Sequence, residues 1–242
     1  MIVVGHRGWP LKYPENTLAS FRGALALGVD AIELDVRLTK DGRLAVLHDA
    51  DTERATGVKG LVGAMTLDEV KRLDAGRRFG AEFALERIPT LDEVMELVAG
   101  KAALFIEVKP PGGRGAAARV VEALLPLIGA YRGPVVIHSF DARFLREFRK
   151  ADPATDTGLL CLASRVTIAR ATRIGCVAIH PEWRSVTPRL NAAIRKAGLR
   201  IMVWTARTEA DCRAILDTLD TDSIAADCPD VLLSTLRERG ER

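Results

Sequence analysis

The sequence alternates short runs of β-branched and other apolar residues with amphipathic stretches that are long enough to form helices. Eight such pairs of strand and helix follow one another along the 242 residues. Parallel neighbouring strands need a crossover connection, so this alternation predicts a parallel sheet with helices on its outside. Eight pairs in a chain of this length indicate an α/β protein and, within that class, a (β/α)8 barrel, the TIM barrel.

The limits of the predicted elements follow from the apolar period of each segment. The strands are expected at Ile2–Gly5, Ala31–Val36, Ala103–Val108, Val135–His138, Thr157–Cys161, Cys176–Ile179, Arg200–Trp204 and Ser223–Ala226. The helices are expected at Glu15–Leu27, Leu91–Val98, Ala116–Leu127, Ala142–Lys150, Ile168–Ile174, Pro188–Ala197, Glu209–Leu219 and Val231–Arg239. An open doubly wound sheet is the alternative, but no glycine-rich dinucleotide turn follows the first strand.

The alternation is interrupted once, between His48 and Glu93. Arg43–Leu47 is predicted as a short strand that returns from a turn. Thr66–Leu73 is predicted as a helix that is capped by Thr66. We therefore expect one domain over residues 1–242, with a small insertion after the second strand at roughly residues 50–88. Such an insertion would lie over the barrel mouth, where loops carry function.

Composition and charge narrow the class of protein further. The formal net charge is only +3, from 35 basic and 32 acidic residues, and no basic stripe of the kind that binds nucleic acid is present. No apolar run approaches the roughly 20 residues of a membrane span, and the N-terminus lacks a charged leader. We expect a cytoplasmic protein with reduced cysteines and no stable membrane association, and the sequence leaves a homo-oligomeric state open.

Acidic side chains end two of the predicted strands. Glu33 and Asp35 are two residues apart in a strand, so both side chains point to one face, and Glu107 ends a later strand. Carboxylates that are buried together repel one another unless a cation neutralises them. A network with Arg37 and other basic residues is the structural alternative. Three oxygen ligands favour a hard divalent ion, Mg²⁺ or Ca²⁺, over zinc.

Two histidines accompany these acids at strand ends. His6 and His48 are candidate catalytic residues, because cleavage of a phosphodiester needs one acid and one base near neutral pH. Asp49 either orients the His48 ring or caps the next turn. His138 and His180 also end strands, but they lack comparable neighbours, and we interpret them as packing residues at the barrel mouth.

The predicted mouth also contains cationic and aromatic side chains. Arg7 and Lys109 are candidate phosphate ligands, since a guanidinium and an ammonium stabilise the charge that develops on phosphorus oxygens. Alternatively, Lys109 only neutralises Glu33 or Glu107. Trp204, which ends the seventh strand, is a candidate substrate-binding wall, and filling the barrel top is its structural alternative.

Six short motifs occur in order along nearly the whole chain. They are His6-Arg7-Gly8, Pro14-Glu15-Asn16-Thr17, Glu33-Leu34-Asp35-Val36, Thr39-Lys40-Asp41-Gly42, His48-Asp49 and Glu107-Val108-Lys109. This ordered set resembles the glycerophosphodiester phosphodiesterase family, in its small bacterial form. The resemblance implies a (β/α)8 barrel and a phosphoric diester hydrolase of lipid and glycerol metabolism. Such enzymes hydrolyse deacylated phospholipids to glycerol 3-phosphate and an alcohol.

The resemblance also implies roles at matching positions. The metal ligands would be Glu33, Asp35 and Glu107, the acid–base pair His6 and His48, and the phosphate contacts Arg7 and Lys109. Near the C-terminus, Asp227-Cys228-Pro229-Asp230 is similar to the family's threonine-aspartate-x-proline ending, with Ala226 in place of threonine. Arg207 stands near a position where the family often has asparagine. Both departures put the identity of the alcohol in doubt more than the chemistry.

Three other functions remain as alternatives. A phospholipase of the same barrel type would need an apolar rim facing a membrane, and the segment Val58–Met65 is only mildly apolar. A catalytically silent module that binds phosphate or metal would not need both histidines. A nuclease is disfavoured by the balanced charge and by an aromatic content of 5%. The sequence does not distinguish water from a substrate hydroxyl as the nucleophile.

Overall fold

The structure, a computed structural model, describes residues 1–110, 112–113 and 115–242. Its strands are β1 (Ile2–His6), β2 (Ala31–Leu38), β3 (Leu44–Val46), β4 (Ala103–Val108), β5 (Val135–Ser139), β6 (Asp156–Cys161), β7 (Ala178–Pro181), β8 (Arg200–Ala206) and β9 (Ser223–Ala226). Its α-helices are α1 (Leu18–Leu27), α2 (Glu53–Thr56), α3 (Leu67–Lys71), α4 (Leu91–Val98), α5 (Ala116–Ala130), α6 (Ala142–Ala151), α7 (Arg165–Ile174), α8 (Pro188–Lys196), α9 (Glu209–Thr218) and α10 (Pro229–Glu238). Among the described helices, none is long and apolar enough to cross a lipid bilayer.

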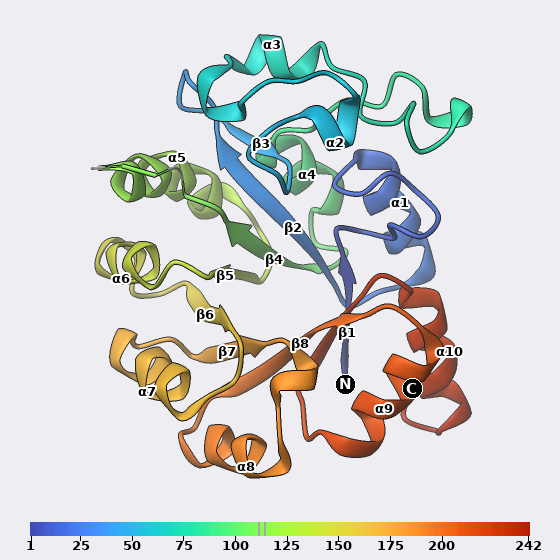
Figure 1. Ribbon diagram of the computed structural model, residues 1–242, viewed down its shortest axis with the longest axis vertical. Helices are drawn as coiled ribbons and strands as arrows, with labels where there is room; N and C mark the ends of the chain where they lie inside the picture. Colours follow the sequence, from blue (N-terminus) through green and yellow to red (C-terminus); the bar gives the residue numbers. More distant parts are fainter. Residues whose placement is uncertain (111, 114) are drawn as a thin grey trace.

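The sheet closes on itself. Its strands are ordered β1, β9, β8, β7, β6, β5, β4, β2 and β3, and β1 also pairs with β2. All of these pairings are parallel except the one between β2 and β3, where Val36 lies opposite Val46. Eight parallel strands therefore form a closed barrel, with helices outside it (Figure 1). The predicted TIM barrel is confirmed.

Most predicted elements match the observed ones, several boundaries differ, and two of these differences have clear local reasons. The first helix begins at Leu18 instead of Glu15, because the Thr17 side chain caps it and Asn16 has a φ of 57° that no helix allows. The sixth barrel strand, β7, begins at Ala178 instead of Cys176. Here the Cys176 amide donates to Ala171, which completes the end of α7.

The segment between β3 and α4 carries the interruption of the alternating pattern. β3 is the predicted short returning strand, and α3 begins with the predicted capping box of Thr66 and Glu69. The segment has a small core of its own, which includes Val62, Val70 and Ile88. Figure 1 shows it at one side of the barrel, over the ends of β2 and β3. The division into one domain with an insertion stays a prediction.

The two faces of each barrel strand have opposite surroundings. On β2, Ile32, Leu34 and Val36 are fully buried in the cluster shared with the outer helices. Ala31 and Phe105 belong to a separate cluster inside the barrel. Because side chains alternate along a strand, the residues two positions after this inner cluster also point inward. The inner apolar layer thus forms a floor below the polar residues at the strand ends.

Candidate active site

Three carboxylates from neighbouring strands meet at the carboxyl end of the barrel. Glu33 and Asp35 lie within β2, which continues to Leu38, and Asp35 lies in register with Glu107 of β4. All three side chains are buried, and one oxygen of each lies within 4.8 Å of the others. The predicted acidic cluster is therefore assembled at one end of the barrel.

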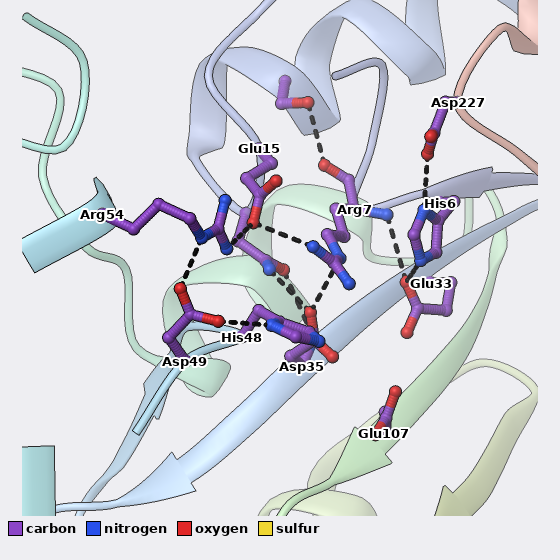
Figure 2. A network of polar contacts seen from close by, with 12 residues as sticks. His6, Arg7, Glu15, Glu33, Asp35, His48, Asp49, Arg54, Glu107 and Asp227 are labelled. Carbon is purple, nitrogen blue, oxygen red and sulfur yellow. Dashed lines mark hydrogen bonds and ion pairs between the residues drawn. The ribbon is translucent and has the colours of Figure 1, made fainter. Parts of the chain in front are cut away.

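Two cations hold this cluster together, and Figure 2 shows the first of them, Arg7. Arg7 Nε lies 3.2 Å from Asp35 Oδ2, and the Arg7 amide donates to Glu33 Oε2 at 3.1 Å. Lys109 Nζ lies 3.0 Å from Asp35 Oδ1 and also donates to Glu107. Both the predicted position of Lys109 at the mouth and its neutralising contact with Glu107 are therefore observed.

Burial and charge divide the protons unequally among the acids. Burial, reinforced by Asp35 and Glu107, raises the pKa of Glu33 well above its ordinary value. Burial and the charge of Asp35 raise the pKa of Glu107 to about 7. Burial also opposes the ionisation of Asp35, but Lys109 and Arg7 outweigh it and hold this pKa well below its ordinary value. The two cations therefore do not fully neutralise the three carboxylates, and a divalent cation would supply the missing positive charge.

His6 lies on one side of the carboxylates. Its Nδ1 donates to Asp227 Oδ1 at 2.6 Å, and its Nε2 lies 3.9 Å from Glu33 Oε2. Asp227 directly follows β9, which pairs with β1. This hydrogen bond holds the His6 ring so that Nε2 faces the cluster.

His48 follows β3 on another side of the cluster and is held in a similar way. Its Nδ1 donates to Asp49 Oδ1 at 2.7 Å, so Asp49 orients the ring. Arg54 of α2 contacts Asp49 and, through Nη2, donates to Glu15 Oε1 at 2.7 Å. Burial, the largest influence, lowers the pKa of His48, which leaves the ring neutral at pH 7.

Glu15 completes a path of alternating charges between the two histidines (Figure 2). Its Oε1 also accepts from Arg7 Nη1 at 3.0 Å. Asn16 donates to Asp35 Oδ2 at 2.8 Å, and the strained left-handed backbone of Asn16 places its amide there. The motif at the start of α1 therefore supports the acidic cluster as well as capping the helix.

A cavity of about 310 Å³ opens beside the cluster. Its polar end is lined by His6, Arg7, Glu33, His48, Glu107 and Lys109. Its remaining lining residues are His138, Phe140, Leu160, Met202, Trp204, Thr205, Arg207 and Ala225. The structure thus brings together every predicted site residue except Asp35 as cavity lining, and Asp35 contacts two of the lining cations, Arg7 and Lys109.

Some residues have a larger part in the site than the sequence indicated. His138 is buried as a packing residue would be, but it also lines the cavity, and its Nε2 lies 3.7 Å from Glu33 Oε1. Burial lowers the pKa of His138 well below its ordinary value, so the ring is neutral. Asp227 carried a detectable signal, because an acid that directly follows a barrel strand points to the mouth. Arg54 carried no such signal in the sequence, since the position of a four-residue helix in a long insertion is not predictable.

Comparison with known proteins identifies the family. The model of the glycerophosphoryl diester phosphodiesterase family matches residues 6–231. The chain belongs to this family. Its members are phosphoric diester hydrolases, so the predicted resemblance is confirmed.

Relatives of the family resemble the chain over its whole length. A glycerophosphodiester phosphodiesterase of Caldanaerobacter subterraneus subsp. tengcongensis is 39% identical and covers 99% of both chains. One of Bacillus altitudinis is 34% identical over 94% of this chain and 95% of its own. A phosphodiesterase of Oleispira antarctica, solved with the product sn-glycerol-3-phosphate, has a TM-score of 0.91 at 28% identity, covering 98% of this chain and 97% of that one.

Proposed function

We propose that the chain hydrolyses glycerophosphodiesters to glycerol 3-phosphate and an alcohol, and that it needs a divalent cation, Mg²⁺ or Ca²⁺. Membership of the family supports the reaction class, and the named product in the Oleispira antarctica structure supports a small-molecule substrate. One structural observation supports the need for a cation and the roles of the site residues. Two carboxylate-held imidazoles flank three buried carboxylates in a cavity that also presents Arg7 and Lys109.

The acidic cluster fits a hard divalent cation. Glu33, Asp35 and Glu107 would hold it, because they present carboxylate oxygens within 4.8 Å of one another and no sulfur ligand. When bound, the ion would supply Lewis acidity toward a phosphoryl oxygen. Glu33 and Glu107, whose pKa values burial raises, would be ionised when they hold the cation.

The side chains of the polar end would bind and orient the phosphate. Arg7 and Lys109 line the cavity with fixed positive charge, and the carboxylates behind them hold their positions. A phosphate between them gains negative charge as the attacking oxygen approaches, which these groups stabilise more strongly than the ground state.

The two histidines would transfer the protons. Each has its Nδ1 occupied by a carboxylate, so Nε2 is the nitrogen available to the substrate. His48, which burial keeps neutral, would accept the proton of the attacking water or glycerol hydroxyl. His6 would donate a proton to the departing alkoxide, and Asp227 would hold its ring in place.

The test is release of glycerol 3-phosphate from a panel of glycerophosphodiesters by the purified protein, with and without chelator. We expect turnover that disappears with chelator and returns when Mg²⁺ or Ca²⁺ is added. Hydrolysis that resists chelator would refute the role of the metal. Unchanged turnover in His48→Ala would show that the cavity is a binding module, and a preference for intact phospholipid vesicles would favour a phospholipase.

A further inference from the structure

The cavity lining includes one cationic side chain, that of Arg207, whose charge the site leaves largely free. Arg7 is paired with Glu15 at 3.0 Å and Asp35 at 3.2 Å, and Lys109 contacts both Asp35 and Glu107. The third lining cation, Arg207, has a single carboxylate contact among the described residues. Its Nε lies 3.4 Å from Asp227 Oδ2.

That contact neutralises Arg207 only in part. Asp227 already accepts the hydrogen bond of His6 through its other oxygen, at 2.6 Å. The Arg207 side chain lines the cavity and is 67% exposed, so its guanidinium is accessible at the cavity surface. The backbone beneath it is well held, because the Arg207 amide donates to Asp211 Oδ2 at 2.9 Å. The charge therefore has a defined position at the cavity rim.

The apolar part of the cavity lining suits carbon more than hydroxyl groups. It is made of Phe140, Leu160, Met202, Trp204 and Ala225. The Trp204 Nε1 already donates to the carbonyl of His180 at 2.8 Å, so it offers no donor to a ligand. The carbon chain of the alcohol therefore fits this wall better than the polyhydroxylated glycerol does, and it would end near Arg207.

We propose that Arg207 selects the alcohol of the substrate by its charge, favouring glycerophosphodiesters whose alcohol bears a carboxylate or a second phosphate. This inference rests on the proposed function. A cationic amine would meet two opposing influences in this cavity. The edge-to-face pair of Phe140 and Trp204, 5.6 Å apart, would attract it, whereas the guanidinium would repel it. A full charge acts over a longer range than a ring quadrupole, so the repulsion prevails.

The test uses three substrates that differ only in the end of a two-carbon alcohol. They are glycerophosphoglycolate, glycerophosphoethylene glycol and glycerophosphoethanolamine, which end in an anion, a neutral hydroxyl and a cation. For the wild type we expect kcat/KM to fall in that order. In Arg207→Gln the ratio of anionic to cationic substrate should drop about fivefold, mainly through KM, and Arg207→Glu should reverse the order.

Two controls separate this effect from others. Arg207→Lys keeps the charge and should keep the order of substrates. Arg213→Gln makes the same charge change on α9 at a residue paired with Glu209 and Glu238, and it should leave the ratios unchanged. High salt, about 500 mM, should compress the wild-type ratios toward those of Arg207→Gln.

The outcomes distinguish the two proposals. If no glycerophosphodiester is hydrolysed, the proposed function fails. If the neutral substrate is hydrolysed but the ratios are the same in wild type and Arg207→Gln, then only the charge selection fails, and the alcohol does not reach Arg207. An equal loss for all three substrates would likewise overturn it, because it would mean that Arg207 acts solely through Asp227.

Discussion

At the scale of single residues, the site depends on carboxylates that hold imidazole rings. Asp227 binds Nδ1 of His6 and Asp49 binds Nδ1 of His48, so each ring presents Nε2 to the cavity. A carboxylate in this position fixes both the tautomer and the orientation of the ring. The amide of asparagine has the same shape, but it lacks the charge that stabilises a protonated ring.

Asp227→Asn should therefore lower kcat by about 100-fold, with little change in KM, because the loss falls on proton transfer and not on phosphate binding. Steady-state kinetics with a glycerophosphodiester would measure both constants. Asp230→Asn, three residues further along and outside the cavity, is the matched control. A kcat that remains within about twofold of the wild type would contradict the role of His6 as proton donor.

At the scale of elements, the insertion between β3 and α4 contributes directly to the site. α2 places Arg54 between Asp49 and Glu15, although 39 residues separate Arg54 from Glu15. Its guanidinium therefore links the insertion to Glu15 in the loop after β1 and to Asp49, which holds His48 after β3 (Figure 2). Without Arg54, Asp49 would be free to leave His48, and Glu15 would keep Arg7 as its remaining ionic partner.

Arg54→Gln should lower kcat/KM by about tenfold, because the orientations of both His48 and Arg7 become looser. Arg54→Lys should restore part of the loss, since it keeps the charge but not the two-pronged contact. The control is Arg77→Gln in the same insertion, where the side chain is highly exposed and paired with Asp74. Equal activity of the Arg54 and Arg77 variants would show that the insertion does not position the catalytic groups.

At the scale of the whole molecule, barrel closure confines like charges and so makes stability depend on pH. Glu107 has a pKa of about 7 in the fold, above its ordinary value of 4.5. Between these values the folded state binds more protons than the unfolded state, so this group's contribution to stability falls as pH rises. The lowered pKa values of His48 and His138 act in the opposite direction over part of this range.

We expect the metal-free wild type to lose thermal stability relative to Glu107→Gln as pH rises from about 5 to about 7, because both proteins share the histidine contribution. Melting temperatures at several pH values would measure this difference. Added Mg²⁺ or Ca²⁺ should raise the wild-type melting temperature most at high pH, where the carboxylates are ionised. Melting curves of the two proteins that stay parallel with pH would refute the raised pKa.

The order of the elements was predictable, whereas their exact ends were less so. Alternating periods indicated each barrel strand, and the cap at Thr66 marked a helix start correctly. The strand at Ala178 was misplaced by two residues, because the amide of Cys176 completes the preceding helix. Local patterns identify an element, but competition for individual hydrogen bonds decides where it ends.

By itself, the sequence determined the barrel and the convergence of Glu33, Asp35 and Glu107, because parallel strands with alternating side chains bring their carboxyl ends to one rim. Only the tertiary structure decided the partners that lie far apart in sequence, such as Asp227 at His6 and Arg54 at Glu15. These contacts depend on how the barrel closes and on the path of the irregular insertion between β3 and α4. No local period encodes either, so the supporting charges emerge only when the whole chain is folded.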